Sequence, residues 1–187
     1  MNIVLGFFAA FTVLNFVLIL GLLRQSRRQN DVISALSRAR TSNREILPRG
    51  TPIADFAATT VDGEQRSLAD FAGAPGLFGI FVVHCPPCEA KIPEFKAYVR
   101  RATAQGARAL AVVIGGADGV ADYVSELGEV IPVVVEAPGG PLPTAFSVPG
   151  YPAFFALDPT GRVWSSGPTV RSLAQSPAPQ AETSDVG

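Results

Sequence analysis

The sequence predicts an α/β domain whose central sheet has strands of mixed direction, joined to an N-terminal transmembrane helix. Between residues 50 and 174, short apolar runs of strand length alternate with segments of helical pattern, and the last run is followed by a hairpin turn. Near the N-terminus, the 21 consecutive residues 3–23 carry no charge. The chain of 187 residues is therefore expected to hold one domain of ordinary size and a membrane anchor.

Residues 3–23 are long enough to cross a bilayer. At about 1.5 Å per residue, a helix of this length spans roughly 31 Å, and a hydrocarbon core is about 30 Å thick. A cleaved signal peptide is the alternative, but it usually has a basic start, a shorter apolar run and a small-residue cleavage site. Here Met1-Asn2 starts the chain, Leu22-Leu23-Arg24 closes the run, and no cysteine lies nearby for a lipoprotein anchor. We therefore expect residues 1–23 to be an uncleaved signal-anchor.

Charge is unevenly distributed along the chain, whose formal net charge is −1. Residues 24–50 contain seven arginines against Asp31 and Glu45, a balance of +5, so the remainder of the chain carries −6. A basic segment beside a membrane, followed by an acidic domain, favours contact with lipid headgroups and argues against nucleic-acid binding. The same arginines can also simply keep the segment solvated, and both interpretations stay open.

The pattern divides the chain into four parts. After the anchor (1–23), residues 24–48 combine a basic, partly amphipathic helix with a linker that ends near Pro48-Arg49-Gly50. Residues 49–174 form the folded domain, which is long enough to bury a core. The last segment, 175–187, is polar and contains prolines, and we expect it to be disordered.

Within the folded domain the expected elements follow one another in a regular order. An edge segment at 55–58 and a turn at 61–64 precede a short helix over 68–73, capped by Ser67. The expected strands are 76–83, 110–114, 131–135, 152–157 and, after a turn at 158–161, 162–164. The expected helices run from Cys85 to about Ala104 with a kink at Pro93, over 118–127, and for one turn at 143–146. The apolar runs, 76–83 above all, are typical of strands buried on both faces.

The residues that can carry chemistry are concentrated in FVVHCPPCEAKIPEF, residues 81–95, which holds both cysteines and the only histidine. Because a strand precedes Cys85 and a helix follows it, Cys85 is expected at the N-cap. Pro86 and Pro87 then fill the first turn, where helical N–H groups lack intrahelical partners anyway. The N–H of Cys88 points back at the Cys85 sulfur and, with the positive end of the helix dipole, stabilises a thiolate there. This predicts an exposed nucleophile at Cys85 and a more buried resolving thiol at Cys88.

Other roles for the two cysteines fit less well. A disulfide across two intervening residues would hold almost nothing together, and a zinc site needs four ligands where the chain has two cysteines and one histidine. A cysteine protease places its histidine elsewhere in the fold. Redox chemistry is therefore the leading interpretation. Two alternatives stay open, a metallochaperone that binds copper(I) through Cys85, Cys88 and His84, and a binding module without redox activity.

Together with the CPPC motif, two further stretches resemble the thioredoxin-like, membrane-anchored thiol–disulfide oxidoreductases of the TlpA/ResA type. They are RGTPIADFAATTVDGEQRSLADFAG and VPGYPAFFALDPTGRV, in the family's order and spacing over residues 49–165. LLRQ, directly after the apolar run, is similar to the MauD branch. The resemblance implies a thioredoxin-like fold, attack by Cys85 and resolution by Cys88. It also implies a cis bond at Pro152 beside the disulfide, with Tyr151 and Pro152 contacting the client.

The chain departs from the family pattern at four positions. His84 stands where the family usually has tryptophan, and Lys91 stands three residues after the second cysteine, where reductases of cytochrome c maturation often carry glutamate. Gly79 stands where thioredoxin has a buried aspartate, and Tyr151 is bulkier than the usual threonine or valine before the cis-proline. Two proton-handling carboxylates are therefore missing, which argues against a reductase of the haem pathway.

His84 directly precedes the first cysteine. It is either a partly exposed residue at a strand end or a client-binding residue whose imidazole flanks the Cys85 sulfur and, when protonated, favours the thiolate. With Lys91 one turn beyond Cys88 and no carboxylate at Gly79, we expect surroundings of positive charge. A stabilised thiolate stabilises the reduced form and makes the disulfide more oxidising.

The expected function is that of a membrane-tethered thiol–disulfide oxidoreductase acting on proteins outside the cytoplasm. The expected partners are protein thiol or disulfide clients, a membrane or soluble redox partner, and the lipid bilayer, with no metal, cofactor or nucleic acid. The arginines within 24–50 conflict with this location, because the positive-inside rule places such segments in the cytoplasm. Tethering of a redox domain nevertheless favours the outside, and long domains can be exported despite flanking charge.

Overall fold

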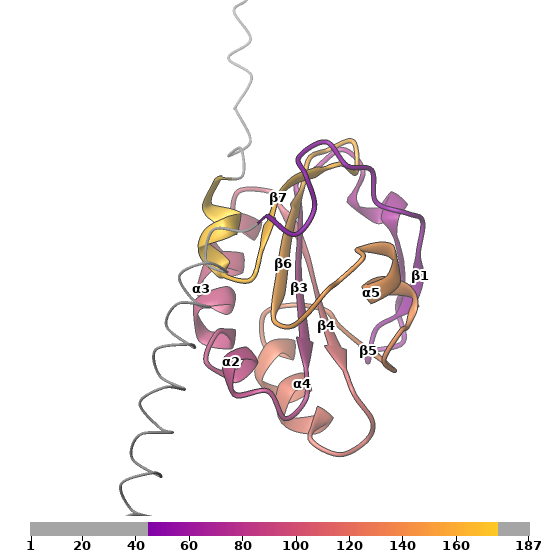
Figure 1. Ribbon diagram of the computed structural model, residues 1–187, viewed down its shortest axis with the longest axis vertical. Coiled ribbons are helices and arrows are strands. Elements are labelled where there is room, and N and C mark those ends of the chain that lie inside the picture. The colour runs from indigo at the N-terminus through magenta and orange to yellow at the C-terminus, as the bar shows by residue number, and fades with distance from the viewer. Residues whose placement is uncertain (1–44, 176–187) are drawn as a thin grey trace, which may run out of the picture. The chain divides into compact units, whose positions relative to one another are not determined.

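The central sheet of the domain has five strands of mixed direction. The computed structural model describes residues 45–175, in which the strands lie in the order β5-β4-β3-β6-β7 (Figure 1). Their bounds are Gly76–Val82 (β3), Arg108–Ile114 (β4), Val133–Glu136 (β5), Ala153–Leu157 (β6) and Val163–Gly167 (β7). The pairs β3–β4 and β4–β5 are parallel, whereas β6 is antiparallel to both β3 and β7. The predicted mixed sheet is therefore confirmed.

β3 is the middle strand, and both of its faces are buried. Ile80 pairs with Val112 of β4 on one side and with Ala153 of β6 on the other. Side chains alternate between the two faces along a strand, so Phe78 and Ile80 enter one core whereas Phe81 enters the other. The unbroken apolar run that predicted this strand follows from burial on both faces.

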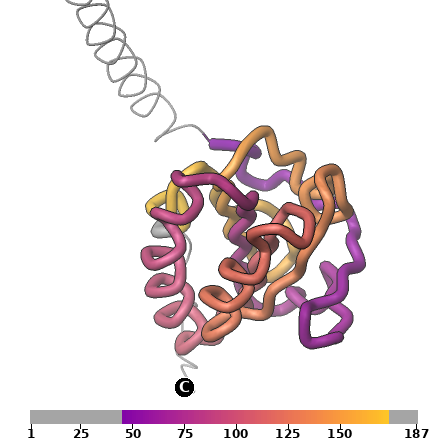
Figure 2. Tube along the Cα trace, turned by 90° about the horizontal axis from the view of Figure 1, so that it is seen from below, coloured from indigo at the N-terminus to yellow at the C-terminus, as the bar shows by residue number. Residues whose placement is uncertain are grey.

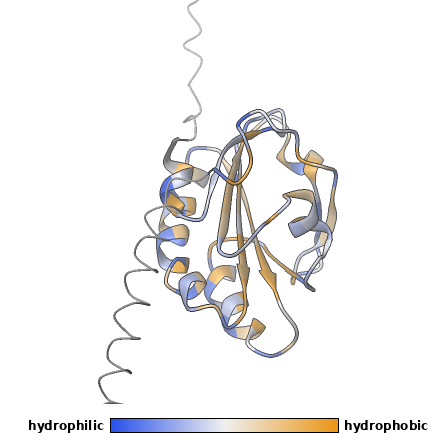
Figure 3. Ribbon diagram, in the orientation of Figure 1, coloured by the Kyte–Doolittle hydropathy of each residue, from blue (hydrophilic) through white to orange (hydrophobic). Residues whose placement is uncertain are grey.

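Different elements cover the two faces of the sheet. The helical face is covered by α3, α4 and the 3-10 helix η2, and the opposite face by α5, the 3-10 helix η1 and the β1–β2 hairpin (Figures 1 and 2). Their bounds are Ile92–Thr103 (α3), Val120–Gly128 (α4), Val170–Gln175 (η2), Pro141–Ala145 (α5), Leu68–Phe71 (η1), Ala57–Thr59 (β1) and Gln65–Ser67 (β2). Figure 3 shows apolar strands at the centre and a mixture of apolar and polar residues along α3 and α4. One apolar core therefore lies on each face.

Phenylalanine side chains fill much of both cores. On the helical face, the ring centroids of Phe81, Phe95 and Phe154 lie 5.3–5.7 Å apart. On the opposite face, the ring of Phe78 lies 4.5 Å from that of Phe71 and 4.7 Å from that of Phe146. Aromatic pairs at such separations stabilise a fold by about 0.5–1.5 kcal/mol each beyond the burial of their area.

The segment after the cysteines forms two helices instead of one kinked helix. α2 covers only Pro86–Glu89, and α3 starts after a break at residues 90–91. Pro93 causes the break, since it has no N–H and its ring would collide with the carbonyl of Glu89, four residues earlier, in a continuous helix. The prediction of a single helix from Cys85 was therefore wrong at this point.

Most other elements lie close to their predicted positions. The helix expected over 118–127 is α4, the turn expected at 143–146 overlaps α5, and the edge segment expected at 55–58 overlaps β1. β1 pairs with β2, a strand that the sequence analysis did not predict, and the strand expected at 162–164 continues to Gly167 as β7. η2, which follows β7, was also not predicted.

The first described residues run beside β7. The hydroxyl oxygen of Ser166 accepts hydrogen bonds from the N–H groups of Ile46 and Leu47 at 3.0 and 2.8 Å. The N–H of Gly50 donates to the carbonyl oxygen of Val163 at 2.7 Å. These bonds cover one edge of the sheet, which would otherwise expose unpaired backbone groups.

The predicted anchor (1–23), residues 24–44 of the predicted basic segment and residues 176–187 of the predicted tail lie outside the described residues. Within residues 45–175, the structure contains no helix that is both long enough and apolar enough to cross a membrane. The described residues belong to one compact unit, which contains the whole of the candidate site.

Candidate active site

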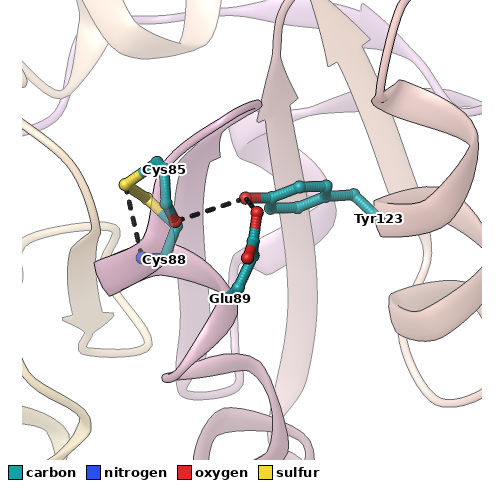
Figure 4. The surroundings of a disulfide bond; sticks show 4 residues. All are labelled: Cys85, Cys88, Glu89 and Tyr123. Carbon is teal, nitrogen blue, oxygen red and sulfur yellow. Dashed lines mark hydrogen bonds between the residues drawn. A yellow bond between two sulfur atoms is a disulfide. The ribbon is translucent and has the colours of Figure 1, made fainter.

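Cys85 and Cys88 form a disulfide just beyond the central strand (Figure 4). β3 ends at Val82, and its carboxyl end lies at the same edge of the sheet as those of its parallel neighbours β4 and β5. The two Cα atoms are 5.2 Å apart, which is within the usual range for a disulfide. The sheet and α2 thus hold the two sulfurs together at one end of the domain.

The predicted N-cap geometry of Cys85 is confirmed. Its sulfur accepts a hydrogen bond from the N–H of Cys88 at 3.3 Å, and Pro86 and Pro87 occupy the first helical positions. The same N–H lies 2.8 Å from the carbonyl oxygen of Cys85, so one donor serves two acceptors. Because α2 is a single turn of 4 residues, this local donor acts on the sulfur more directly than the dipole of a long helix would.

The two cysteines differ in exposure. Cys88 is 0% exposed and belongs to the core on the helical face, whereas Cys85 is partly exposed. An incoming sulfur atom can therefore reach Cys85 before Cys88. This agrees with the order of attack that the family resemblance implied, and the order itself stays a prediction.

The packing around position 79 explains why this residue is glycine. A Cβ atom on this residue would lie 2.5 Å from Cε1 of Phe95 and 3.0 Å from Cε2 of Phe81. Carbon atoms in optimal contact are about 3.5–4.0 Å apart, so neither ring leaves room for a side chain at position 79. The space that a buried carboxylate would need there is occupied by aromatic rings.

The Tyr151–Pro152 peptide bond is cis, as the family resemblance implied. Pro152 directly precedes β6, whose first residue, Ala153, pairs with Ile80 of β3. Continuing this antiparallel register places Pro152 and Tyr151 beside the end of β3, just before the CPPC motif. Tyr151 is partly buried and packs against both cores, and burial raises the pKa of its hydroxyl. Both residues thus lie at the disulfide's edge of the sheet, and their contact with a client stays a prediction.

His84 adopts a left-handed backbone conformation and contacts the loop between β4 and α4. Its φ is 56°, in a region that few residues other than glycine adopt, although histidine does so more often than most. Its Nε2 lies 3.3 Å from Oδ2 of Asp118, and a Cβ atom on Gly119 would lie 3.0 Å from its Cε1. The imidazole therefore faces Asp118. Its influence on the Cys85 sulfur stays a prediction.

The expectation of positive surroundings is wrong for the described residues. Nζ of Lys91 donates a hydrogen bond to Oε2 of Glu94 at 2.8 Å, and His84 faces Asp118. Glu89, directly after the second cysteine, adds another carboxylate. Both nearby basic residues therefore face an acidic one, and Glu89 adds a further acidic side chain.

Tyr123 is a neighbour of the disulfide that the sequence analysis did not find. Its hydroxyl, which α4 supplies, lies 3.4 Å from Oε1 of Glu89 and 3.5 Å from the carbonyl oxygen of Cys85 (Figure 4). Burial raises the pKa of Tyr123, and the Glu89 carboxylate raises it further. No sequence spacing points to this contact, because it depends on how α4 packs beside α2.

The copper(I) alternative finds no ligand set in the part of the chain that the structure describes. No group of three or more histidine, cysteine, aspartate or glutamate residues there is placed to hold a metal ion. The proposed ligands were Cys85, Cys88 and His84, but the imidazole faces Asp118. The geometry therefore does not favour this alternative.

Comparison with known proteins places the fold and the site in one class. A model of the AhpC/TSA family matches residues 49–166. A thiol:disulfide interchange protein of the thioredoxin family from Chlorobium tepidum is 27% identical, with a TM-score of 0.56 over 69% of this chain and 92% of that chain. The exposed lipoprotein thioredoxin of Streptococcus pneumoniae is 26% identical, with a TM-score of 0.52 over 65% and 96%. A secreted disulfide oxidoreductase of Mycobacterium tuberculosis, 22% identical over 58% and 79% with a TM-score of 0.51, shows the same fold.

These matches define the class as thioredoxin-like oxidoreductases, and the predicted thioredoxin-like fold and enzyme class are confirmed. The chain belongs to the AhpC/TSA family, whose model spans the CPPC motif and the cis-proline. No curated protein sequence matches the chain.

Proposed function

We propose that the chain is a membrane-tethered thiol–disulfide oxidoreductase of the TlpA/ResA type that exchanges disulfides with protein clients outside the cytoplasm. One observation carries the proposal: a partly exposed sulfur, Cys85, is paired with a fully buried one, Cys88, whose N–H donates to it at 3.3 Å. Pro86 and Pro87 have no N–H, so Cys88 supplies the first donor of α2. This donor stabilises negative charge on the Cys85 sulfur when the disulfide opens.

The exchange takes place in two steps. In the reducing direction, the Cys85 thiolate attacks a client disulfide, so a Cys85–client bond forms, the client bond breaks, and the leaving client sulfur takes up a proton. Cys88 then loses its proton and attacks the Cys85 sulfur, which forms the Cys85–Cys88 disulfide and releases the second client thiol. Two electrons pass to the client. The reverse sequence oxidises a client dithiol, and the same geometry serves both directions.

The membrane tether and the extracytoplasmic location belong to the same proposal. The uncharged run at residues 3–23 supports the tether. Two similar structures support the location, since one is described as an exposed lipoprotein and the other as a secreted protein. In that location the domain would meet exported clients, a membrane or soluble redox partner, and the bilayer. Alkaline phosphatase fused after residue 174 should then be active, whereas activity of a reporter that works only in the cytoplasm would place the domain inside.

Trapping of clients tests the chemistry. The Cys88→Ser variant should accumulate mixed disulfides between Cys85 and its clients, because nothing resolves the intermediate, and mass spectrometry of the trapped species then identifies them. The Cys85→Ser variant is the matched control and should trap little. Trapping by Cys85→Ser alone would reverse the two roles, and trapping by neither variant would reject the proposed exchange.

A further inference from the structure

We propose that Tyr123 and Glu89 act as a pair of positioning residues that sets the reactivity of Cys85 through its carbonyl oxygen. The inference rests on the proposed function, since it takes Cys85 as the attacking thiol. Neither side chain takes part in the two exchange steps described above. The Tyr123 hydroxyl nevertheless lies 3.4 Å from Oε1 of Glu89 and 3.5 Å from the carbonyl oxygen of Cys85.

Three hydrogen-bond donors lie near the carbonyl oxygen of Cys85, which is more than one acceptor can bind well. The N–H of Cys88 lies 2.8 Å away, the N–H of Glu89 3.1 Å away and the hydroxyl of Tyr123 3.5 Å away. A carbonyl oxygen has two lone pairs, so these three donors compete. A stronger bond from Tyr123 therefore weakens the hold of the carbonyl on the other two.

The Cys88 N–H is the donor for which this competition has a chemical consequence. It also lies 3.3 Å from Sγ of Cys85, so it divides its interaction between the oxygen and the sulfur. When Tyr123 donates to the carbonyl oxygen, the Cys88 N–H can form a stronger hydrogen bond to the sulfur. A donor on the sulfur stabilises the thiolate, so the Tyr123 hydroxyl is connected to the reactivity of Cys85 through two hydrogen bonds.

The Tyr123 hydroxyl is held between two acceptors. Its distances of 3.4 Å to Glu89 and 3.5 Å to the Cys85 carbonyl are both longer than the usual 2.5–3.0 Å for O–H···O bonds. A hydroxyl has one proton to donate, so the carboxylate of Glu89 draws it away from the carbonyl. Tyr123 is 5% exposed, and burial together with Glu89 raises its pKa, so it stays protonated while a thiol titrates.

Removing the Tyr123 hydroxyl and removing the Glu89 carboxylate should change the stability of the Cys85 thiolate in opposite directions. Tyr123→Phe removes the third donor, so the Cys88 N–H returns to the carbonyl and the thiolate loses stabilisation. Glu89→Ala releases Tyr123 to the carbonyl and removes a negative charge beside the thiolate, and both changes favour the thiolate. Other titratable groups in this region are Glu126 on α4 and His84, directly before Cys85, which faces Asp118 of the loop between β4 and α4.

The test measures alkylation of Cys85 in the reduced protein as a function of pH, and the equilibrium with glutathione at pH 7. For Tyr123→Phe we expect the pH midpoint of alkylation to rise by about half a unit and the equilibrium constant for reduction to fall about threefold, or about 14 mV. Glu89→Ala should shift both quantities the opposite way. In the double variant the effect of Glu89→Ala should become smaller than in the wild type, because the hydroxyl that this substitution releases is no longer present.

Two matched controls separate this effect from a loss of stability. Tyr98→Phe removes the hydroxyl of another partly buried tyrosine. That hydroxyl donates to the carbonyl oxygen of Leu173 at 2.7 Å, away from the disulfide. Glu126→Gln removes a charge from α4 but leaves the contact between Tyr123 and Glu89 in place. Both controls should match the wild type in alkylation and in the glutathione equilibrium.

The outcomes distinguish the inference from the function on which it rests. A wild-type protein that forms no reversible disulfide with glutathione would reject the proposed function. If the wild type cycles normally but Tyr123→Phe equals Tyr98→Phe, or shifts in the same direction as Glu89→Ala, the positioning role is rejected. Should Tyr123→Phe fail to fold, Glu89→Ala and Glu89→Gln decide alone, and a midpoint equal to that of the wild type in both variants rejects the role.

Discussion

Phe95 occupies the space that a side chain on Gly79 would need, since a Cβ atom there would lie 2.5 Å from Cε1 of the ring. The two residues come from α3 and β3, which pack against each other in the core that also holds Cys88. The absence of a carboxylate at position 79 is therefore tied to the packing of this core. The proton of the buried Cys88 thiol consequently has no acceptor at this position.

Substitution of Gly79 should destabilise the domain. Gly79→Ala forces a methyl group against Phe95, and such overpacking typically costs about 1–3 kcal/mol. Unfolding in urea should therefore show a lower midpoint with an unchanged slope. Gly116→Ala is the control, because a Cβ atom there has no neighbour within 4 Å. Combined with Phe95→Leu, which makes room, Gly79→Ala should cost less than it does alone. Equal costs in both backgrounds would contradict the packing argument.

The two thiols of the reduced protein should react at different rates. Cys85 is partly exposed and receives the Cys88 N–H, whereas Cys88 is fully buried. Iodoacetamide at neutral pH should therefore label Cys85 at least about tenfold faster, since the thiolate and its access control the rate. Peptide mapping by mass spectrometry measures both rates in one sample, with the urea-unfolded protein as the reference. Faster labelling of Cys88 in the folded protein would show that the order of attack is reversed.

The sequence predicts features of this fold that depend on local chemistry. The apolar run that forms β3 indicates burial on both faces, and within a helix the two prolines after Cys85 fit only the first turn. The position of the break after α2 was missed, although Pro93 causes it. A proline pattern identifies a disturbed helix, but the clash with the carbonyl of Glu89 decides whether that helix bends or ends.

Contacts between distant segments were beyond the sequence analysis. The Tyr123–Glu89 contact joins residues 34 positions apart, and the His84–Asp118 pair also joins segments far apart in the chain. Both depend on the path of the loop between β4 and α4, which no spacing or periodicity in the sequence fixes. This explains part of the failed expectation of a positive active site, because Asp118, which faces His84, had not been placed. Glu94, which faces Lys91, is only three residues away in the sequence and had not been considered.

The stability of the domain should depend on pH through Glu136. Burial raises the pKa of this carboxyl group, while the N–H of Leu142, 3.0 Å away, acts against the shift. A raised pKa in the folded state means that the stabilisation is present below the unfolded pKa and is lost as pH rises through the folded value. From about pH 4 to 7, the wild type should therefore lose stability relative to Glu136→Gln. Urea unfolding of both proteins across this range measures the difference.

Glu129 supplies a control of opposite sign for that experiment. Its pKa is lowered by the hydrogen bond and then by the charge of Lys96, whose Nζ lies 2.8 Å away. The stabilisation of the folded protein by ionised Glu129 is present above the pKa of this group in the unfolded chain. It is lost as pH falls through the pKa in the folded protein. The advantage of the wild type over Glu129→Gln should thus shrink on acidification. If both variants shift the pH profile in the same direction, the burial of Glu136 is not the cause of its effect.

His84 and Asp118 provide a test of whether charge beside the CPPC motif influences the redox potential. The Nε2–Oδ2 distance is 3.3 Å, and the side chains are 64% and 96% exposed, so water and salt screen the pair. His84→Asn removes the imidazole with a residue that also tolerates positive φ. It should destabilise the thiolate and shift the potential to more negative values. Asp118→Asn removes the opposing acid and should shift the potential to more positive values.

Both shifts should be small. A change of one pKa unit corresponds to about 30 mV for a two-electron couple, and exposure reduces the effect of this pair to about 15 mV or less. Both shifts should decrease at about 1 M salt, where the screening length is about 3 Å. Glu129→Gln, an exposed acid away from the disulfide, is the control. If both variants equal the wild type from pH 5 to 8, His84 acts only as a residue at the end of a strand.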